Sequence, residues 1–220
     1  MLNPELFVFL KELKQNNQKE WFESNRQRYT ILREQFIQSI SLLVHELTIM
    51  DPSLGPIDPR KTVFRINRDI RFSKDKSPYK TNMGAYISSG GKNAFTPGYY
   101  IHVEPDKNMV AGGMYMPPGE QLKKIRTEIF DNLDEFKEII EGEDFVRTFG
   151  SLDNEGMLKT APQGFPKDHP DIGLLRYKSY VVFRELPDSF LTGSDALQRI
   201  MEIFEVMMPL NRFLRNSLIT

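Results

Sequence analysis

The sequence predicts an α+β protein in which a largely antiparallel sheet of about five to six strands is flanked by N-terminal and C-terminal helices. Three observations predict this fold class. Apolar residues recur at helical spacing in residues 1–50, and the pattern changes to an alternation of period two in residues 61–116. The strands of that region also follow one another through short turns instead of alternating with helices, which excludes a doubly wound parallel sheet.

Residues 1–50 are predicted to be helical. Asn3 followed by Pro4 is typical of an N-cap with proline at the first helical position. Asn17, with Glu20 three residues later, resembles a capping box that opens a second helix. The apolar stripe of this second helix has steps of three and four residues. It consists of Leu32, Phe36, Ile40, Leu43 and Leu47.

Residues 61–116 are predicted to form the core of the sheet. The expected strands are Val63–Asn67, Met83–Ser88, Tyr99–Glu104 and Met109–Met116. Alternation along the third strand gives it two faces. One face carries Tyr100, His102 and Glu104, and the other carries Tyr99, Ile101 and Val103. The connection Pro105–Asn108 is short and predicts a hairpin turn. Gly112-Gly113 inside the next strand predicts a bulge or a close approach of another backbone.

The second half of the chain is predicted to return to helix and then to add one more strand. Residues 118–149 have helical spacing, whereas residues 151–178 are polar and rich in proline and are expected to form an irregular loop. Residues 180–219 hold a strand and the C-terminal helices, which Ser194 caps and Pro209 kinks or divides. Because no composition shift marks a linker, we expect a single domain over the whole chain.

The composition excludes several classes of protein. Of the 220 residues, 40% are hydrophobic and 27% are charged, which is typical of a globular protein. The absence of cysteine excludes disulfides, thiolate metal sites and a cysteine nucleophile. The histidines His45, His102 and His169 lack the spacing of a metal site, so we predict no metal and no cofactor. Without a signal-peptide core or a long apolar run, we expect a cytoplasmic protein without a membrane partner.

The formal net charge of −1 hides a strongly basic segment. Residues 60–80 contain eight basic and two acidic side chains, which gives +6 and leaves −7 on the other 199 residues. Arginine suits bidentate contact with phosphate or carboxylate. We therefore predict that this segment binds an anionic small molecule, which we expect to bear a phosphate. The candidate ligand-binding residues are Arg65, Arg68, Arg71, Lys74, Lys76, Tyr79, Lys80 and Tyr100.

The candidate catalytic residues are His102, Glu104 and Asp69. His102 shares a strand face with Tyr100 and Glu104, and if that face lines a cleft the three form an acid/base set. The alternative is that they make ordinary cross-strand hydrogen bonds on a half-solvated sheet face. Asp69, together with Asp75, is expected to orient the arginines of the basic segment.

Two other functions fit the same residues. Phe72 and Tyr79 lie among the cations and could stack on the bases of a single-stranded nucleic acid. Alternatively, the arginines pair with carboxylates such as Glu20, Glu23 or Glu34 and only fix the segment in place. In that case the protein is a non-catalytic interaction or scaffold module.

The string RDIRFSKDKSPYKTN, residues 68–82, resembles the signature of a family of conserved hypothetical proteins, found mainly in bacteria and also in fungi. The family is catalogued as a domain of unknown function. Further similar features are Asn16-Asn17, Trp21-Phe22, Asn25, Tyr29, Gly98-Tyr99-Tyr100, Glu104-Pro105, Gly112-Gly113 and Asp168-His169-Pro170. The resemblance implies one full-length domain and a cytoplasmic enzyme or binding protein without an assigned activity. It supplies no catalytic residues.

Overall fold

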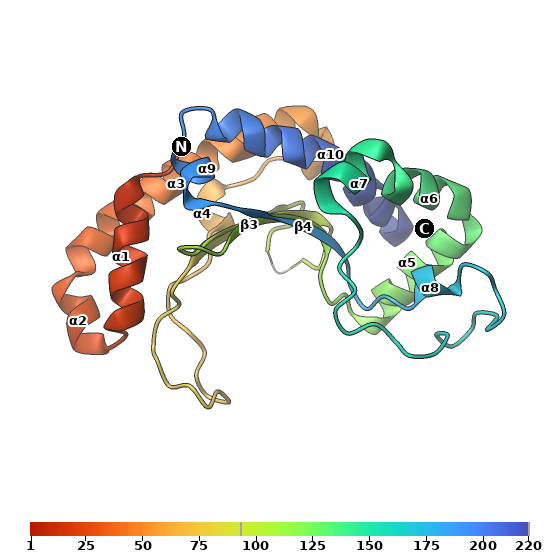
Figure 1. The fold of residues 1–220 in the computed structure, drawn as a ribbon, viewed down its shortest axis with the longest axis horizontal. Coiled ribbons are helices and arrows are strands. Elements are labelled where there is room, and N and C mark those ends of the chain that lie inside the picture. Colours follow the sequence, from red (N-terminus) through yellow and green to blue (C-terminus); the bar gives the residue numbers. More distant parts are fainter. Residues whose placement is uncertain (93, 220) are drawn as a thin grey trace. The chain divides into compact units, whose positions relative to one another are not determined.

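Figure 1 shows the computed structural model of the chain, which describes residues 1–92 and 94–219. The protein is α+β, as predicted. Within the described residues the strands form one four-stranded antiparallel sheet, in which each strand lies beside its predecessor in the chain. The prediction of five to six strands is therefore wrong for this part of the chain. The strands are β1 (Met83–Ser88), β2 (Gly98–Val103), β3 (Asn108–Met114) and β4 (Tyr180–Leu186).

The chain divides into two compact units, and it passes more than once through each of them. Unit 1 consists of Met1–Lys92, Tyr100–Val110 and Glu185–Glu202. Unit 2 consists of the described residues of 94–99, 111–184 and 203–219. All candidate catalytic and ligand-binding residues belong to unit 1. A single domain over the whole chain stays a prediction.

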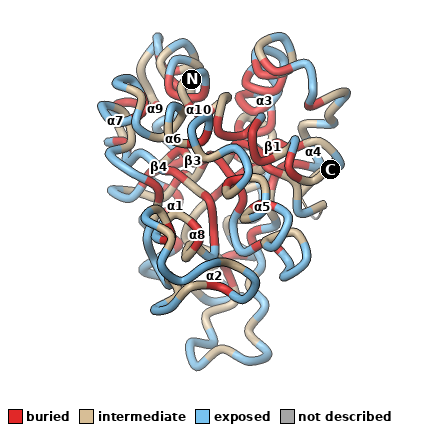
Figure 2. Tube along the Cα trace, turned by 90° about the vertical axis from the view of Figure 1, so that its right-hand side faces the viewer, coloured by how far each residue is buried: buried red, intermediate tan, exposed pale blue. Residues whose placement is uncertain are grey.

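Unit 1 contains the N-terminal helices, and the sequence signals of the first helix are confirmed. Asn3 Oδ1 accepts a hydrogen bond from the Glu5 amide at 2.9 Å, and Pro4 lies in the first helical turn. The predicted apolar stripe is buried along α3, whose buried turns are red in Figure 2. The helical elements that lie wholly in unit 1 are α1 (Pro4–Gln15), α2 (Lys19–Ser24), α3 (Arg26–Met50), η1 (Pro52–Leu54), α4 (Pro59–Thr62) and α9 (Asp188–Thr192).

The predicted capping box at Asn17 is wrong. Helix α2 has Gln18 as its N-cap, without a side-chain hydrogen bond. Asn17 instead binds the backbone of Tyr79 twice: its Nδ2 donates to the carbonyl oxygen at 2.9 Å, and its Oδ1 accepts from the amide at 3.1 Å. The ring of Tyr79 stacks on Phe22 with centroids 3.9 Å apart. The side chain therefore satisfies two backbone groups of a distant segment instead of one helix amide.

The predicted strand Val63–Asn67 is also wrong. Its two ends form isolated antiparallel bridges with different partners, Val63 with Ala85 and Asn67 with Tyr79. The second bridge belongs to a hairpin-like arm, which we define as residues 66–80. Two further backbone bonds close the base of the arm, from the Arg68 amide to the Pro78 oxygen and from the Lys80 amide to the Ile66 oxygen. A segment that changes partner after one bridge cannot build a regular ladder.

Strand β2 has the predicted alternation. Tyr99, Ile101 and Val103 are at most 1% exposed, whereas Tyr100 and His102 are half-buried on the opposite side. The predicted hairpin turn between β2 and β3 is confirmed by a hydrogen bond of 2.9 Å from the Lys107 amide to the Glu104 oxygen.

Unit 2 contains most of the second helical region. The predicted helical segment is divided into three helices, and the predicted irregular loop contains one short helix. These helices are α5 (Gly119–Asp131), α6 (Leu133–Glu141), α7 (Glu143–Phe149) and α8 (Ile172–Leu175). The C-terminal helix α10 (Ala196–Ile219) continues through Pro209, so the predicted division at that residue is wrong. Burial of Met207, Leu210 and Phe213 compensates for the backbone bond that proline cannot donate.

The predicted close approach at Gly112-Gly113 is confirmed within unit 2. Gly113 has φ +108°, and a Cβ built on it lies 2.0 Å from the Tyr180 carbonyl oxygen. Its amide donates a hydrogen bond of 2.8 Å to Oδ1 of the buried Asn211. A Cβ on Gly112 lies 2.7 Å from the sulfur of Met207. Only residues without a side chain let β3 approach β4 and α10 this closely.

We expect Gly113→Ala to destabilise the protein by about 3 kcal/mol or more, because it adds backbone strain to a clash with a neighbouring backbone oxygen. Chemical denaturation measures the loss. The matched control is Gly119→Ala, whose added Cβ has no atom within 4 Å and lies at the start of α5. Equal stability of the two variants would contradict the close approach.

Candidate functional site

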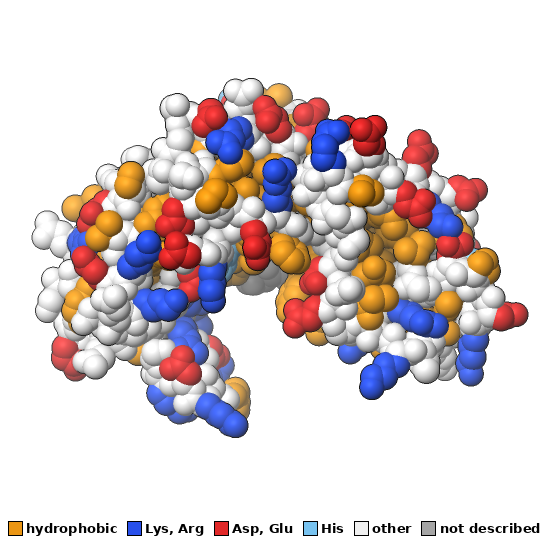
Figure 3. Space-filling view, viewed as in Figure 1, with side chains coloured by type: hydrophobic (Ala, Val, Ile, Leu, Met, Phe, Trp, Pro, Cys, Tyr) orange, Lys and Arg blue, Asp and Glu red, His pale blue; other side chains and the backbone are white. Residues whose placement is uncertain are grey.

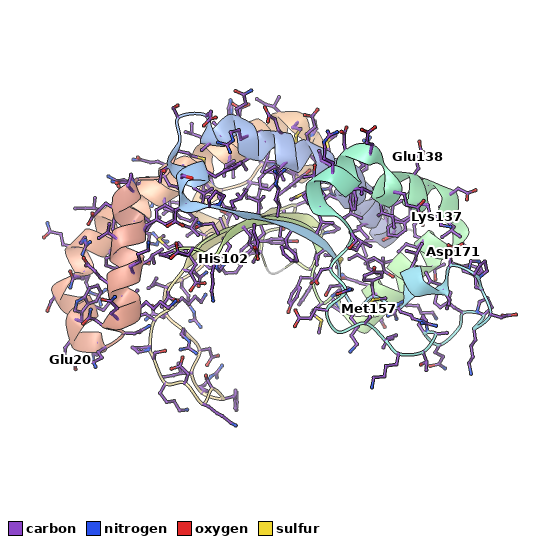
Figure 4. All side chains as sticks on the ribbon, viewed as in Figure 1. Glu20, His102, Lys137, Glu138, Met157 and Asp171 are labelled. Carbon is purple, nitrogen blue, oxygen red and sulfur yellow. The ribbon has the colours of Figure 1, made fainter. Side chains whose placement is uncertain are left out.

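Three polar side chains of β2 and its end form a connected chain, which we call the polar face: Tyr100, His102 and Glu104. The Tyr100 hydroxyl lies 3.0 Å from His102 Nδ1, and His102 Nε2 lies 3.4 Å from Glu104 Oε2. The His102 and Glu104 side chains are 17% and 19% exposed. Figure 4 labels His102 on the sheet. The residues that the sequence places on one strand face are therefore in contact.

Residues just before β1 support this face. The Thr81 hydroxyl donates to Glu104 Oε1 at 3.0 Å, and Asn82 Nδ2 lies 3.3 Å from His102 Nδ1. Because the amide nitrogen of Asn82 can only donate, His102 Nδ1 is the accepting nitrogen. This assignment leaves the ring proton on Nε2, facing Glu104.

Burial, with a smaller contribution from Glu104, raises the pKa of Tyr100 to about 12. The hydroxyl is therefore protonated at neutral pH and donates to His102. Gly84 allows this position, because a Cβ on Gly84 would lie 2.8 Å from the Tyr100 hydroxyl oxygen. The missing side chain on β1 thus makes room for the phenol.

Three cations gather beside the Tyr100 end of the polar face, and we call them the cation cluster: Arg65, Lys80 and Lys92. Lys80 Nζ lies 5.4 Å and Lys92 Nζ 5.5 Å from the centroid of the Phe64 ring. Phe64 in turn meets the Tyr100 ring edge-on at 6.2 Å. Burial, followed by the charges of Arg65 and Lys92, lowers the pKa of Lys80. The ammonium of Lys80 is therefore held near like charges.

The three side chains of the cation cluster form no ion pair with the described part of the chain. Among the described residues, no Asp or Glu oxygen lies within 4.0 Å of a side-chain nitrogen of Arg65, Lys80 or Lys92. Lys92 Nζ donates to the Val63 carbonyl oxygen at 2.9 Å. The charge of Arg65 helps to lower the pKa of Asp69, after the hydrogen bonds from Arg71. That carboxylate is nevertheless bound to Arg71.

Three cations farther along the arm, Arg68, Arg71 and Lys76, are bonded within it. Arg71 binds Asp69 through Nε at 2.9 Å and Nη2 at 2.7 Å. Arg68 forms an ion pair with Asp75. Lys76 Nζ donates to the Ile70 carbonyl oxygen at 3.0 Å. These predicted ligand-binding residues are not brought to the polar face, and Asp69 orients Arg71 instead of joining His102 and Glu104.

The two aromatic residues that were expected to stack on bases, Phe72 and Tyr79, also differ in their exposure. Tyr79 is only 5% exposed and stacks on Phe22, so its ring is not available for a base. Phe72 is 95% exposed at the outer end of the arm. Lys74 is exposed on the same part of the arm. Figure 3 shows the arm at the lower left, with acidic and apolar side chains among its basic ones.

One arginine–carboxylate ion pair that the scaffold alternative predicts is present. Arg60 binds Glu34 of α3 through two hydrogen bonds of 2.9 and 2.7 Å. Glu23 instead binds Arg26 of the neighbouring helix, at 2.7 Å from its Nε. The start of the basic segment and its outer arm therefore contain ion pairs of the kind that the scaffold alternative predicts.

Sequence reasoning missed Lys92, Thr81 and Asn82. Lys92 follows Gly90-Gly91 in a predicted hairpin tip, a context that gives no sign of a ligand site. Thr81 and Asn82 are the last two residues of the string 68–82 that resembles the family signature. Their nearness to the basic segment was the signal that could have identified them. Their contacts with β2 depend on sheet pairing between β1 and β2, which the sequence does not specify.

Whether the polar face lines a cleft stays a prediction. Two pockets, of about 410 and 540 Å³, lie along α3, lined by residues such as Phe36 and His45, and contain no residue of the polar face. Within residues 1–92 and 94–219, no group of three His, Asp or Glu side chains has the geometry to hold a metal ion. In the same part of the chain, no helix has both the length and the apolar character to cross a membrane.

Comparison with known proteins identifies a family. A family described as a conserved hypothetical protein (DUF2461) matches residues 5–213. No curated protein and no solved structure matches the chain.

We expect the Asp75 carboxyl to titrate near pH 2 in the folded protein. The amide and hydroxyl of Ser77, followed by Arg68, lower its pKa from 3.8 to about 2. Because the folded-state pKa is lowered, the stabilisation from this carboxylate is complete above its ordinary pKa and is lost as the pH falls towards 2. Carbon-detected NMR titration measures the midpoint.

Ser77→Ala should raise that midpoint, while Ser151→Ala in unit 2 should leave it unchanged. An ordinary midpoint in the unaltered protein would show that the arm is not internally bonded.

Proposed function

Because the chain belongs to this family of conserved hypothetical proteins, whose description names no activity, we propose a function from the site itself. Unit 1 binds an anionic, phosphate-bearing ligand at the cation cluster, beside the polar face. His102 and Glu104 are the groups positioned to exchange a proton with that ligand. We retain a cytoplasmic location as part of the proposal.

The observation that carries the proposal is the gathering of Arg65, Lys80 and Lys92 without a carboxylate partner among the described residues. Lys80 and Lys92 are half-buried, whereas Arg65 is exposed. Like charges held near the half-buried pair raise the free energy of the unliganded protein. A phosphate would relieve this repulsion and accept charge-assisted hydrogen bonds. The outer arm offers no equal attraction, because Arg68 and Arg71 already bind carboxylates.

The polar face adds the chemistry of proton transfer. His102 and Glu104 are less than one-fifth exposed and in contact, and the Tyr100 hydroxyl and Asn82 Nδ2 both approach the one accepting nitrogen of the imidazole, at 3.0 and 3.3 Å. An imidazole held in one orientation by a carboxylate is typical of general acid–base sites. The cation cluster would place a ligand beside this imidazole through the Phe64–Tyr100 contact.

We expect Lys80→Met to weaken the binding of n-propyl phosphate about tenfold, because it removes a partly desolvated charge and keeps the aliphatic contact with Phe64. Isothermal titration calorimetry measures the dissociation constant. Lys92→Met should have a similar effect.

The matched control is Lys74→Met, which removes the same charge from the exposed arm and should change the dissociation constant less than twofold. An equal loss of affinity with Lys74→Met would indicate that the anion binds to the arm. Absence of binding to the unaltered protein at millimolar concentration would overturn the proposal.

Single-stranded nucleic acid is the second candidate ligand, and the exposure of Phe72 favours it. A ring that is 95% exposed next to basic side chains offers one stacking surface for a base. The burial of Tyr79 removes the second stacking surface that the sequence suggested. The pairing of Arg68 and Arg71 also leaves fewer cations for phosphates.

If the arm binds single strands, Phe72→Ala should weaken the binding of an oligothymidylate about tenfold, the magnitude of one lost stacking contact. Fluorescence anisotropy at several salt concentrations gives both the affinity and its dependence on salt. Six phosphate contacts predict a log–log slope of roughly −4. The control is Phe183→Ala, a less exposed phenylalanine of β4. A flat slope, with no difference between the two variants, excludes this function.

A further inference from the structure

We propose that the ligand is bipolar: an anion that carries a hydroxyl or an amino group at its other end, as in a phosphorylated alcohol or amine. The inference rests on the function proposed above and specifies the second half of the ligand. It follows from the hydrogen-bonding capacity that remains on the polar face once its internal bonds are made.

The protons of the polar face are already engaged. The Tyr100 hydroxyl donates to His102 Nδ1, and Thr81 donates to Glu104 Oε1. The ring proton on Nε2 faces Glu104 Oε2, and Nε2 and Oε2 are 3.4 Å apart. Lone pairs on the Glu104 carboxylate and the Tyr100 oxygen therefore remain. A ligand atom placed against them must donate a hydrogen bond.

The charges of the site also change sign along the strand. The ammonium groups of Lys80 and Lys92 lie beside Phe64, which contacts Tyr100, while the carboxylate lies at the Glu104 end. Among the described residues, no lysine or arginine nitrogen lies within 4.0 Å of the Glu104 carboxylate. A ligand that is anionic throughout would be repelled there, whereas an ammonium would supply the missing counter-charge.

The contacts of the polar face set the spacing. The Tyr100 hydroxyl lies 3.0 Å from Nδ1 of the His102 ring, and Glu104 Oε2 lies 3.4 Å from its Nε2. The anion and the donor of the ligand must therefore be separated by several bonds, with the His102 ring between their positions.

Binding of matched alkyl phosphates tests the inference. The probes are n-alkyl phosphates of three to six carbons, each compared by calorimetry at pH 7 with its analogues bearing a terminal amine or hydroxyl. We expect at least one aminoalkyl phosphate to bind about tenfold more tightly than its parent, because the amine adds a charge-assisted hydrogen bond. A hydroxyl should give a smaller gain.

Glu104→Gln should reduce the gain from the amine, measured as the ratio of the two dissociation constants, to about twofold. The control is Glu46→Gln on the exposed side of α3, which should preserve the gain. If the parent phosphates bind through Lys80 and no analogue binds more than twofold tighter, the inference is overturned and the proposed function stands. If no alkyl phosphate binds, the proposed function itself fails.

Discussion

The two-residue period of β2 is the constraint on which the candidate site depends. Successive side chains of a strand point to opposite sides, so burial of Tyr99, Ile101 and Val103 commits the alternate residues to the other face. A shift of one residue would bury His102 and a carboxylate and expose the apolar set. The free energy of burying apolar side chains therefore also fixes the positions of the polar face.

The basic segment shows that neighbours in the sequence can have different electrostatic roles. In a hairpin-like arm, residues close to the two ends of the segment meet at its base, while the middle residues lie far from it. Arg65 and Lys80 flank the base, and the charges of Arg65 and Lys92 act on Lys80, whereas Arg68 and Arg71 lie within the arm and pair with its own carboxylates. Local pairing leaves the arm with a defined structure, while Lys80 and Lys92 lie beside Phe64 without an ion pair to a described residue.

Burial shifts the pKa values of two groups on the same side of the site, Tyr100 and Lys80, in opposite directions for one physical reason. Removal from water disfavours the charged form, so it raises the pKa of Tyr100 and lowers that of Lys80. The phenol remains a donor to His102, and the ammonium gains more from a bound anion than an exposed lysine would. The same environment thus favours an ordered hydrogen bond from Tyr100 and a bound anion beside Lys80.

The sequence by itself determined the features that depend on local pattern: the α+β class, the capped first helix, the alternation of β2, and the glycines at a close approach. Only the tertiary structure decided which of the described cations form ion pairs, that Tyr79 is buried, and that Lys92 lies beside Phe64. The Asn17 clamp on Tyr79 joins residues 62 positions apart, and no local signal encodes such a bond. Hydrogen-bond partners of polar side chains depend on which segments the core brings together, and burial of apolar residues far along the chain determines that arrangement.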